Sequence, residues 1–332
     1  MKITHNRIDH NSGIDLVRVD EDLFALVFTL MKLTPAEYII AKALRAHRIN
    51  NDTRVVETTS GTLGLGLAIV CSQHGLPLTL VSDSAIRGPL LERIRDLGAT
   101  VEIVSPANGE GIQQTRLRRV KELLEQGNCF WPQQYDNPMN AEAYHSIGND
   151  LASHLPGVDT IVGPVGSGGS LCGITAALRN RGLKGSGVRA IAVDTPGSTL
   201  FGLPDQPRSL RGLGNSIHPK NLQTNLVDSV YWVTYPDAAN ATRHLHSRSG
   251  IYAGPTSGAS YLAAVRDREM RPKGSGPTVF VCPDRGDRYP EVYSDEYSEV
   301  HSLPTAPDSP EGEPVHSTCH RPWNRQELTT YA

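Results

Sequence analysis

Two turns rich in glycine and hydroxyl residues stand where the chain passes from an apolar strand into an apolar helix. The first follows Val55-Val56 and reads Thr58-Thr59-Ser60-Gly61-Thr62, and the second follows a strand that ends at Val165 and reads GSGGS. Small residues let the backbone approach a ligand closely, and a helix N-terminus offers unpaired N–H groups at the positive end of its dipole. Each turn is therefore predicted to bind a carboxylate or a phosphate, with an ordinary strand-to-helix turn as the alternative.

Neither turn matches a standard nucleotide motif. In the second turn, Leu171 stands where a dinucleotide fingerprint needs its third glycine, and no GK[ST] of a P-loop is present. Two separate anion sites on one α/β chain fit a small phosphorylated cofactor together with the carboxylate of an amino acid. This combination indicates pyridoxal phosphate, which also requires a lysine amine.

Lys32 is the predicted partner of that cofactor. Lys32 and Lys42 are the only lysines between Lys2 and the first turn. Lys42 lies inside the helical pattern of residues 36–46 and is interpreted as a surface charge. Lys32 stands between an apolar run and a Thr-Pro helix start, where its amine can face a cleft.

The elements that must position these residues alternate between strand and helix patterns. Continuous apolar strands favour a mostly parallel sheet covered on both faces. Strands are predicted at residues 53–58, 76–83, 100–105, 158–165, 188–195, 228–235 and 277–284, and helices at residues 63–75, 88–99, 112–126, 141–155, 171–182, 235–248 and 258–269.

Composition limits the classes of function. The chain has 332 residues, 38% of them hydrophobic, and a net charge of −3, which gives no electrostatic case for binding nucleic acid or an anionic membrane. No apolar run reaches the roughly 18–20 residues that span a bilayer. The five cysteines are dispersed without a CxxC pair, and the polar N-terminus lacks the apolar core of a signal peptide. We therefore expect a cytoplasmic protein with reduced thiols and no metal site.

Six ordered motifs resemble the cysteine synthase/cystathionine β-synthase family of pyridoxal-phosphate enzymes. After Lys32 they are TSGTLG at residues 59–64, WPQQYDNPMN at 131–140, GSGGS at 166–170, RGLGNSIHPKNL at 211–222, GPTSGAS at 254–260 and CPDRGDRY at 282–289. The likeness covers about residues 20–298. It implies fold type II, in which two three-layer α/β domains with mostly parallel sheets, similar to the tryptophan synthase β-subunit, hold the cofactor.

The resemblance also implies a role for each site residue. Lys32 is the catalytic lysine that carries pyridoxal phosphate. The cofactor is bound by Gly166, Ser167, Gly168, Gly169 and Ser170 at its phosphate, by Thr62, and by Thr256 at its ring nitrogen. The carboxylate of the substrate is bound by Thr59, Ser60, Gly61 and Gln134. The expected boundaries are a smaller domain at residues 24–143, a larger domain at 1–23 and 144–300, and a flexible tail at 301–332.

Two motifs depart from the family pattern. Lys32 stands in LMKLT where the family has GSxKDR, and the first turn has Thr62 and Leu63 where the family has asparagine and threonine. A threonine hydroxyl replaces one contact of an amide but not both. These departures favour a specialised relative that makes a 2,3-diaminopropionate-type or other non-protein amino acid.

The implied reaction is β-replacement on an O-activated L-serine, or on serine itself, through an aminoacrylate, with a small nucleophile such as sulfide, a thiol or an amine. The alternatives are β-elimination by a serine/threonine dehydratase-like lyase, and a catalytically silent binding protein of the same fold. A homodimer is expected from the family.

Overall fold

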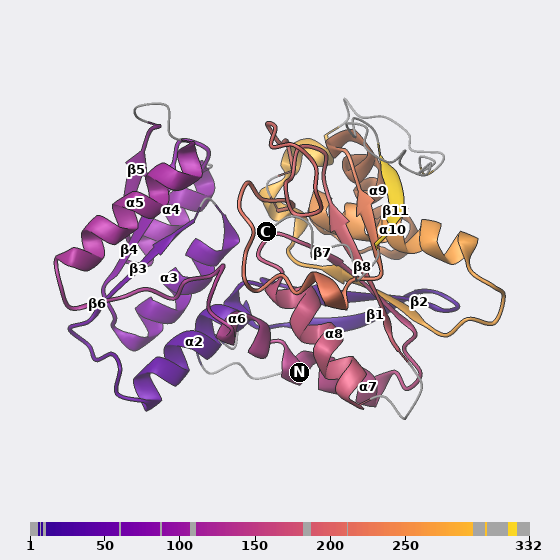
Figure 1. Ribbon diagram of the computed structural model, residues 1–332, viewed down its shortest axis with the longest axis horizontal. Helices are drawn as coiled ribbons and strands as arrows, with labels where there is room; N and C mark the ends of the chain where they lie inside the picture. Colours follow the sequence, from indigo (N-terminus) through magenta and orange to yellow (C-terminus); the bar gives the residue numbers. More distant parts are fainter. Residues whose placement is uncertain are drawn as a thin grey trace. The chain divides into compact units, whose positions relative to one another are not determined.

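The chain folds into two compact units. The computed structural model describes residues 6, 8, 11–59, 61–86, 88–106, 111–181, 187–210, 212–294, 303 and 318–323. Unit 1 comprises Met1–Gly13 and Leu30–Ala143, and unit 2 comprises Ile14–Thr29 and Tyr144–Ala332. Each unit is a mixed α/β structure with its own sheet (Figure 1).

The sheet of unit 1 is parallel throughout its described strands. In spatial order these are β5 (Thr100–Val104), β4 (Leu78–Asp83), β3 (Arg54–Thr58) and β6 (Cys129–Phe130). Since the carboxyl ends of parallel strands lie at one edge of a sheet, the segments that follow β3 and β6 leave the sheet at the same edge.

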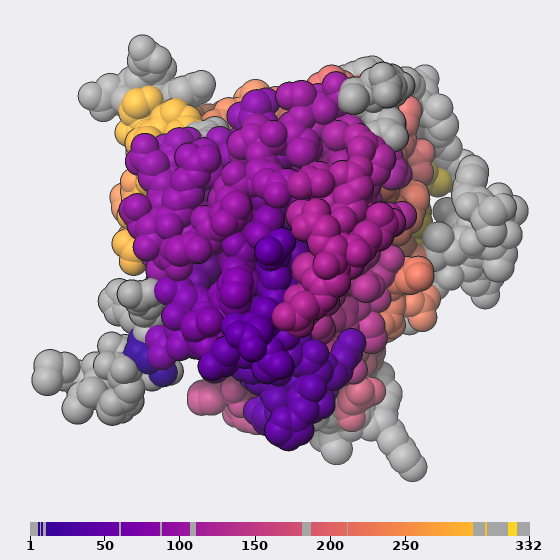
Figure 2. Space-filling model, turned by 90° about the vertical axis from the view of Figure 1, so that its left-hand side faces the viewer, coloured from indigo at the N-terminus to yellow at the C-terminus, as the bar shows by residue number. Residues whose placement is uncertain are grey.

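Helices cover both faces of this sheet. On one face α2 (Leu33–Arg45), α3 (Thr62–His74) and α4 (Gly88–Asp96) pack around Val55, and on the other α5 (Ile112–Glu125) packs against Val56. The short α6 (Met139–Glu142) ends the unit. α3 is apolar on all sides, and its residues from Leu63 to Cys71 are buried, as expected for a central helix. Figure 2 shows one face of this unit, where indigo segments lie beside purple and magenta ones.

The sheet of unit 2 is parallel in its centre and antiparallel at both edges. Its described strands, in spatial order, are β1 (Ile14–Asp20), β2 (Leu23–Phe28), β10 (Thr278–Cys282), β7 (Thr160–Pro164), β8 (Arg189–Asp194), β9 (Ser229–Trp232) and β11 (Cys319–Pro322). β1 pairs antiparallel with β2, and β11 pairs antiparallel with β9. The predicted fold class, two three-layer α/β domains with mostly parallel sheets, is thus confirmed.

Helices also cover both faces of the second sheet. α9 (Tyr235–Ser249) and α10 (Pro255–Met270) lie on one face, and α7 (His145–His154) and α8 (Gly169–Arg181) on the other (Figure 1). α9 begins and ends where its sequence dictates. The hydroxyl of Thr234 accepts a hydrogen bond from the Asp237 N–H, and Gly250 ends the helix in the left-handed conformation.

The C-terminal stretch corrects one expectation. We expected residues 301–332 to form a flexible tail, but Cys319–Pro322 form strand β11 on the edge of β9. The strand is short and its sequence has no periodicity, so nothing in the sequence predicts that these residues pair with the edge of β9. Among the described helices, none is both long and apolar enough to cross a bilayer.

Candidate active site

The first predicted anion turn joins β3 to α3 in unit 1. β3 ends at Thr58, and α3 begins at Thr62 with Gly61 in the N-cap position. The buried Thr59 hydroxyl accepts hydrogen bonds from the N–H groups of Gly61 at 3.1 Å and Gly64 at 3.2 Å. Thr59 therefore shapes the turn through its own side chain, a contribution that the motif alone does not reveal.

The open side of this turn suits an anion. A Cβ built on Gly61 would have no heavy atom of the described residues within 4 Å, and Thr62 is partly exposed as the first residue of α3. The N-terminus of α3 adds the positive end of a helix dipole. Ser60, the remaining residue predicted here, lies outside the described residues.

The structure brings Gln134 to the same turn. The Gln134 amide Nε2 donates to the Thr58 carbonyl at 2.7 Å, and Asn140 Nδ2 donates to the Gln134 carbonyl at 2.6 Å. Gln134 is 9% exposed, so it is not a solvated loop residue. Two segments of unit 1 that the sequence assigns to the substrate's carboxylate are therefore in contact.

A residue that the sequence analysis missed connects these segments. Glu57 is fully buried, and its carboxylate accepts hydrogen bonds from the Trp131 indole at 2.9 Å and from the Gln134 N–H at 3.1 Å. Burial raises the pKa of Glu57 to about 7, against the opposing effect of its hydrogen bonds. The sequence offers one signal for this residue, because Glu57 is a charged residue that directly follows the apolar pair Val55-Val56 in a predicted strand.

Lys32 immediately precedes α2. It occupies the N-cap position of that helix, and α3 packs against its backbone at Gly66. Burial lowers the pKa of the Lys32 amine to about 8, so a larger fraction of it is uncharged near neutral pH than of an ordinary lysine. Lys42 differs sharply, because its side chain is 39% exposed and its ammonium pairs with Glu142 at 2.9 Å, as expected of a surface charge.

The second predicted anion turn joins β7 to α8 in unit 2. Gly168 has a φ of +82°, and a Cβ at this position would lie 2.5 Å from the Leu222 Cα, so only glycine fits. Gly169 is the first residue of α8, and the side chains of Ser167 and Ser170 are buried beside it. Backbone N–H groups, two hydroxyls and a helix N-terminus thus gather within five residues.

The loop that follows β8 holds this turn in place. Asn215 Nδ2 donates to the Gly166 carbonyl at 3.2 Å, and the Gly214 N–H donates to the Val165 carbonyl at 2.8 Å. β7 and β8 are parallel neighbours, so both loops leave the sheet at its carboxyl edge.

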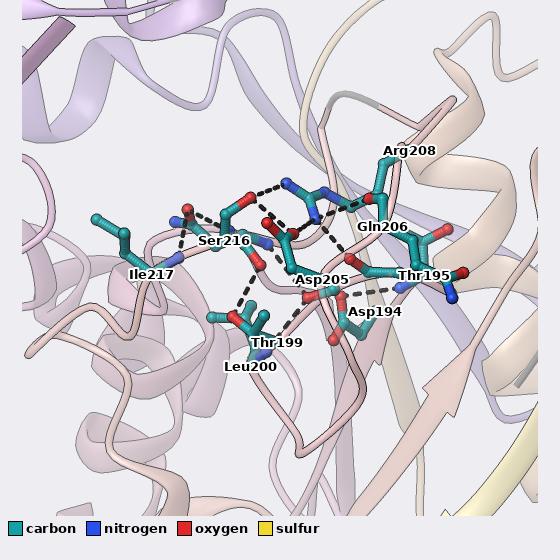
Figure 3. A network of polar contacts seen from close by, with 12 residues as sticks. Asp194, Thr195, Thr199, Leu200, Asp205, Gln206, Arg208, Ser216 and Ile217 are labelled. Carbon is teal, nitrogen blue, oxygen red and sulfur yellow. Dashed lines mark hydrogen bonds and ion pairs between the residues drawn. The ribbon is translucent and has the colours of Figure 1, made fainter. Parts of the chain in front are cut away.

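A network centred on Arg208 fixes that loop in turn. Its guanidinium donates to the Gly197 carbonyl at 2.6 Å, to Asp205 at 2.7 Å and to the Ser216 hydroxyl at 2.6 Å. Figure 3 shows Arg208 beside Asp205 and Ser216. Asp194, at the end of β8, is buried beside the network and accepts a hydrogen bond from the Thr195 N–H at 2.8 Å. This arrangement keeps the carboxyl edge of unit 2 ordered around the turn.

Thr256 is the second residue of α10 and is 5% exposed. Its hydroxyl lies directly above Gly212, where any Cβ would collide with it. The loop that supports the second turn therefore also limits where the Thr256 hydroxyl can lie, which joins two of the predicted cofactor contacts in one unit.

The residues present fit pyridoxal phosphate. The second turn offers N–H and hydroxyl donors at a helix N-terminus and contains no acidic side chain, as a phosphate requires. Lys32 supplies an amine of lowered pKa, as attachment of an aldehyde requires. No group of three or more metal-ligating side chains occurs among the described residues.

Comparisons with known proteins agree with this donor set. The family described as "Pyridoxal-phosphate dependent enzyme" matches residues 4–284. N-(2-amino-2-carboxyethyl)-L-glutamate synthase of Ralstonia nicotianae is 38% identical over 274 residues, which cover 80% of this chain and 79% of that protein. The protein of the same name from Cupriavidus metallidurans is 36% identical over 292 residues, which cover 84% and 85%.

The fold agrees as well. The crystal structure of cysteine synthase from Entamoeba histolytica superposes with a TM-score of 0.79 at 23% identity, covering 91% of this chain and 94% of that one. The resemblance of the motifs to the cysteine synthase group is thereby confirmed. The chain belongs to the pyridoxal-phosphate dependent enzymes, and its fold is that of cysteine synthase.

Proposed function

We propose that this enzyme joins the amino group of L-glutamate to the β-carbon of an O-activated L-serine. The observation that carries the proposal is the identity of 38% and 36% to two synthases whose product is N-(2-amino-2-carboxyethyl)-L-glutamate. That name describes a glutamate nitrogen bonded to the β-carbon of a serine-derived unit. The prediction of a non-protein amino acid of the 2,3-diaminopropionate type is in keeping with this product.

The bonds of the reaction balance without a further reagent. The Cα–H and Cβ–O bonds of the activated serine break, a Cβ–N bond forms, and a proton returns to Cα. The activating group leaves with its oxygen as acetate or phosphate, and the glutamate amine gives up one proton. Pyridoxal phosphate, when bound, supplies the electron sink that makes the Cα proton acidic.

Lys32 would hold the cofactor covalently and move the proton at Cα. An amine with a pKa near 8 is partly unprotonated at neutral pH, so it can accept that proton and return it.

The two turns would hold the anionic groups. Gly166, Ser167, Gly168, Gly169 and Ser170 would bind the cofactor's phosphate, and the Thr256 hydroxyl its ring nitrogen. A neutral hydroxyl there leaves the ring nitrogen less readily protonated than a carboxylate would, which favours loss of a β-substituent. Thr59, Ser60, Gly61 and Gln134 would orient the carboxylate of the serine substrate, with Thr62 beside the cofactor.

The test is direct synthesis. The purified holoenzyme is incubated with L-glutamate and either O-acetyl-L-serine or O-phospho-L-serine, and products are separated and weighed by mass spectrometry. The proposal predicts the glutamate adduct with one of the two donors. A cysteine product with sulfide and no adduct with glutamate would contradict the choice of nucleophile, and keto acid released without any nucleophile would indicate the lyase.

We also propose that the enzyme is a cytoplasmic homodimer. All five cysteines are free thiols in the structure, which supports a reducing compartment. Light scattering of the purified protein tests the dimer, because a monomer mass would contradict it.

A further inference from the structure

Glu57 is a buried acid to which the proposed chemistry assigns no part. It lies in β3 after Val55 and Val56, and all three residues are 0% exposed. No ion pair to Glu57 exists among the described residues. Burying a carboxylate is costly unless hydrogen bonds compensate, so this side chain needs a structural or functional reason.

Three N–H groups compensate the burial. The Glu57 carboxylate accepts from the Thr58 N–H at 2.8 Å, from the Trp131 indole at 2.9 Å and from the Gln134 N–H at 3.1 Å. One donor belongs to the strand that leads into the first turn. The other two belong to the segment after β6. The carboxylate thus connects two pieces of chain that are far apart in sequence.

The sheet cannot make this connection by itself. β6 is only two residues long and pairs with Arg54 and Val55, so its ladder stops before the end of β3. Beyond it the chain turns at Gln133, a non-glycine residue with a φ of +56°. Side-chain hydrogen bonds therefore replace the missing ladder opposite the end of β3. Glu57 accepts from the Gln134 N–H on the side of β3, and Asn140 donates to the Gln134 carbonyl.

We propose that Glu57 is a positioning residue that fixes Gln134 against the turn Thr58–Thr62, so that both meet the carboxylate of the serine substrate in one geometry. This inference rests on the proposed function, in which the turn and Gln134 bind that carboxylate. Glu57 acts through Gln134, whose Nε2 already donates to the Thr58 carbonyl at 2.7 Å.

A positioning role differs from a merely structural one in what it changes. Loss of packing alone lowers stability and affects both substrates alike. Loss of the hydrogen bonds that Glu57 accepts raises the KM for the activated serine and leaves the KM for the nucleophile unchanged. It also has no further effect once the Gln134 side chain is gone, because the two residues act as one unit.

The test is a double-mutant cycle on the holoenzyme with Glu57→Gln, Gln134→Ala and the double variant. Glu57→Gln keeps the shape but replaces an acceptor oxygen by an NH₂ donor facing N–H groups, and a rise of about tenfold in the KM for the activated serine is expected. The double variant should match Gln134→Ala, and Glu57→Asp should recover part of the affinity. Glu102→Gln removes the same charge from a partly exposed pair with Arg119 in the same unit and is the control.

Additive effects in the cycle, equal KM changes for both substrates, or a KM within about twofold of the wild type would each overturn the inference. If Glu57→Gln does not fold, Trp131→Phe removes one donor to the carboxylate and should raise the same KM in the wild type but not in Gln134→Ala. The KM for the activated serine is measured with whichever nucleophile reacts. A wild-type enzyme that turns over no activated serine contradicts the proposed function, whereas a working wild type with an unaffected Glu57→Gln contradicts this inference alone.

Discussion

Gly66 packs directly on the backbone of Lys32: a Cβ at position 66 would lie 2.8 Å from the Lys32 carbonyl oxygen and 3.2 Å from the Leu33 nitrogen. α3, which starts at the turn Thr58–Thr62, therefore touches the point where α2 starts after Lys32. In unit 1 this contact fixes the position of the Lys32 backbone relative to the turn.

Gly66→Ala should disturb this contact. The obstacle is backbone rather than the end of a flexible side chain, so α3 or the Lys32 backbone must move, at a cost of about 1–3 kcal/mol in the free energy of unfolding. We expect a lower urea midpoint and a reduced kcat. Gly88→Ala is the control, because a Cβ there meets nothing within 4 Å. Equal urea midpoints for the two variants would show that the contact accommodates a methyl group without loss of stability.

Reloading of cofactor-free enzyme should depend on pH through Lys32. Burial lowers the pKa of its amine to about 8, and only the unprotonated amine attacks an aldehyde. The rate of attachment, followed by absorbance after addition of pyridoxal phosphate, should therefore rise with pH and level off above about pH 8. A rate that keeps rising towards the ordinary lysine value of about 10.4 would show that the amine is not desolvated.

Stability should fall as the pH rises towards neutrality. Burial raises the pKa of Glu57 and of Asp194 to about 7, so the folded chain binds their protons more tightly than the unfolded chain does. Their contribution is complete below the unfolded pKa values of about 4 and is lost as the pH rises through about 7. The urea midpoint of unfolding should decrease gradually between about pH 5 and pH 8.

Asp194→Asn isolates one part of this dependence. Its amide does not ionise, so the decrease of the urea midpoint over the same pH range should be smaller than in the wild type. A wild-type midpoint that rises between the two pH values would contradict the direction of both shifts.

The C-terminal strand should contribute to the stability of unit 2. β11 covers the edge of β9, where the tilted rings of Tyr231 and His320 lie 4.5 Å apart between centroids. Beside it the Thr318 hydroxyl accepts a hydrogen bond from the Thr234 N–H at 3.0 Å. A chain ending at residue 317 should unfold at lower urea and aggregate more readily, because it exposes an unpaired strand edge. A chain ending at residue 323 keeps β11 and is the control. Identical unfolding of the two chains would contradict a stabilising role.

The sequence is informative where short local patterns determine structure. The strand-to-helix turns at Thr58–Thr62 and Gly166–Ser170 are readable because glycine and hydroxyl residues at such junctions have a local cause. The alternation of apolar strands and helices likewise predicts parallel sheets. Both features depend on neighbours within a few residues.

Features that depend on distant partners were not readable. The β1–β2 hairpin and strand β11 complete the sheet of unit 2 at its edges, where pairing with a distant strand decides the conformation. Glu57 acquires its role only when Trp131 and Gln134 arrive from another segment. Similarly, the Thr59 hydroxyl is predicted to bind substrate, whereas the structure shows that it also bonds to its own turn.

The covalent attachment of the cofactor tests the account most directly. Reducing the holoenzyme with borohydride fixes the cofactor to its lysine, and digestion followed by mass spectrometry identifies the modified peptide. The account predicts a phosphopyridoxyl group on the peptide that contains Lys32 and none on the peptide that contains Lys42. Modification of another lysine, or no modification of a protein that retains its fold, would contradict it.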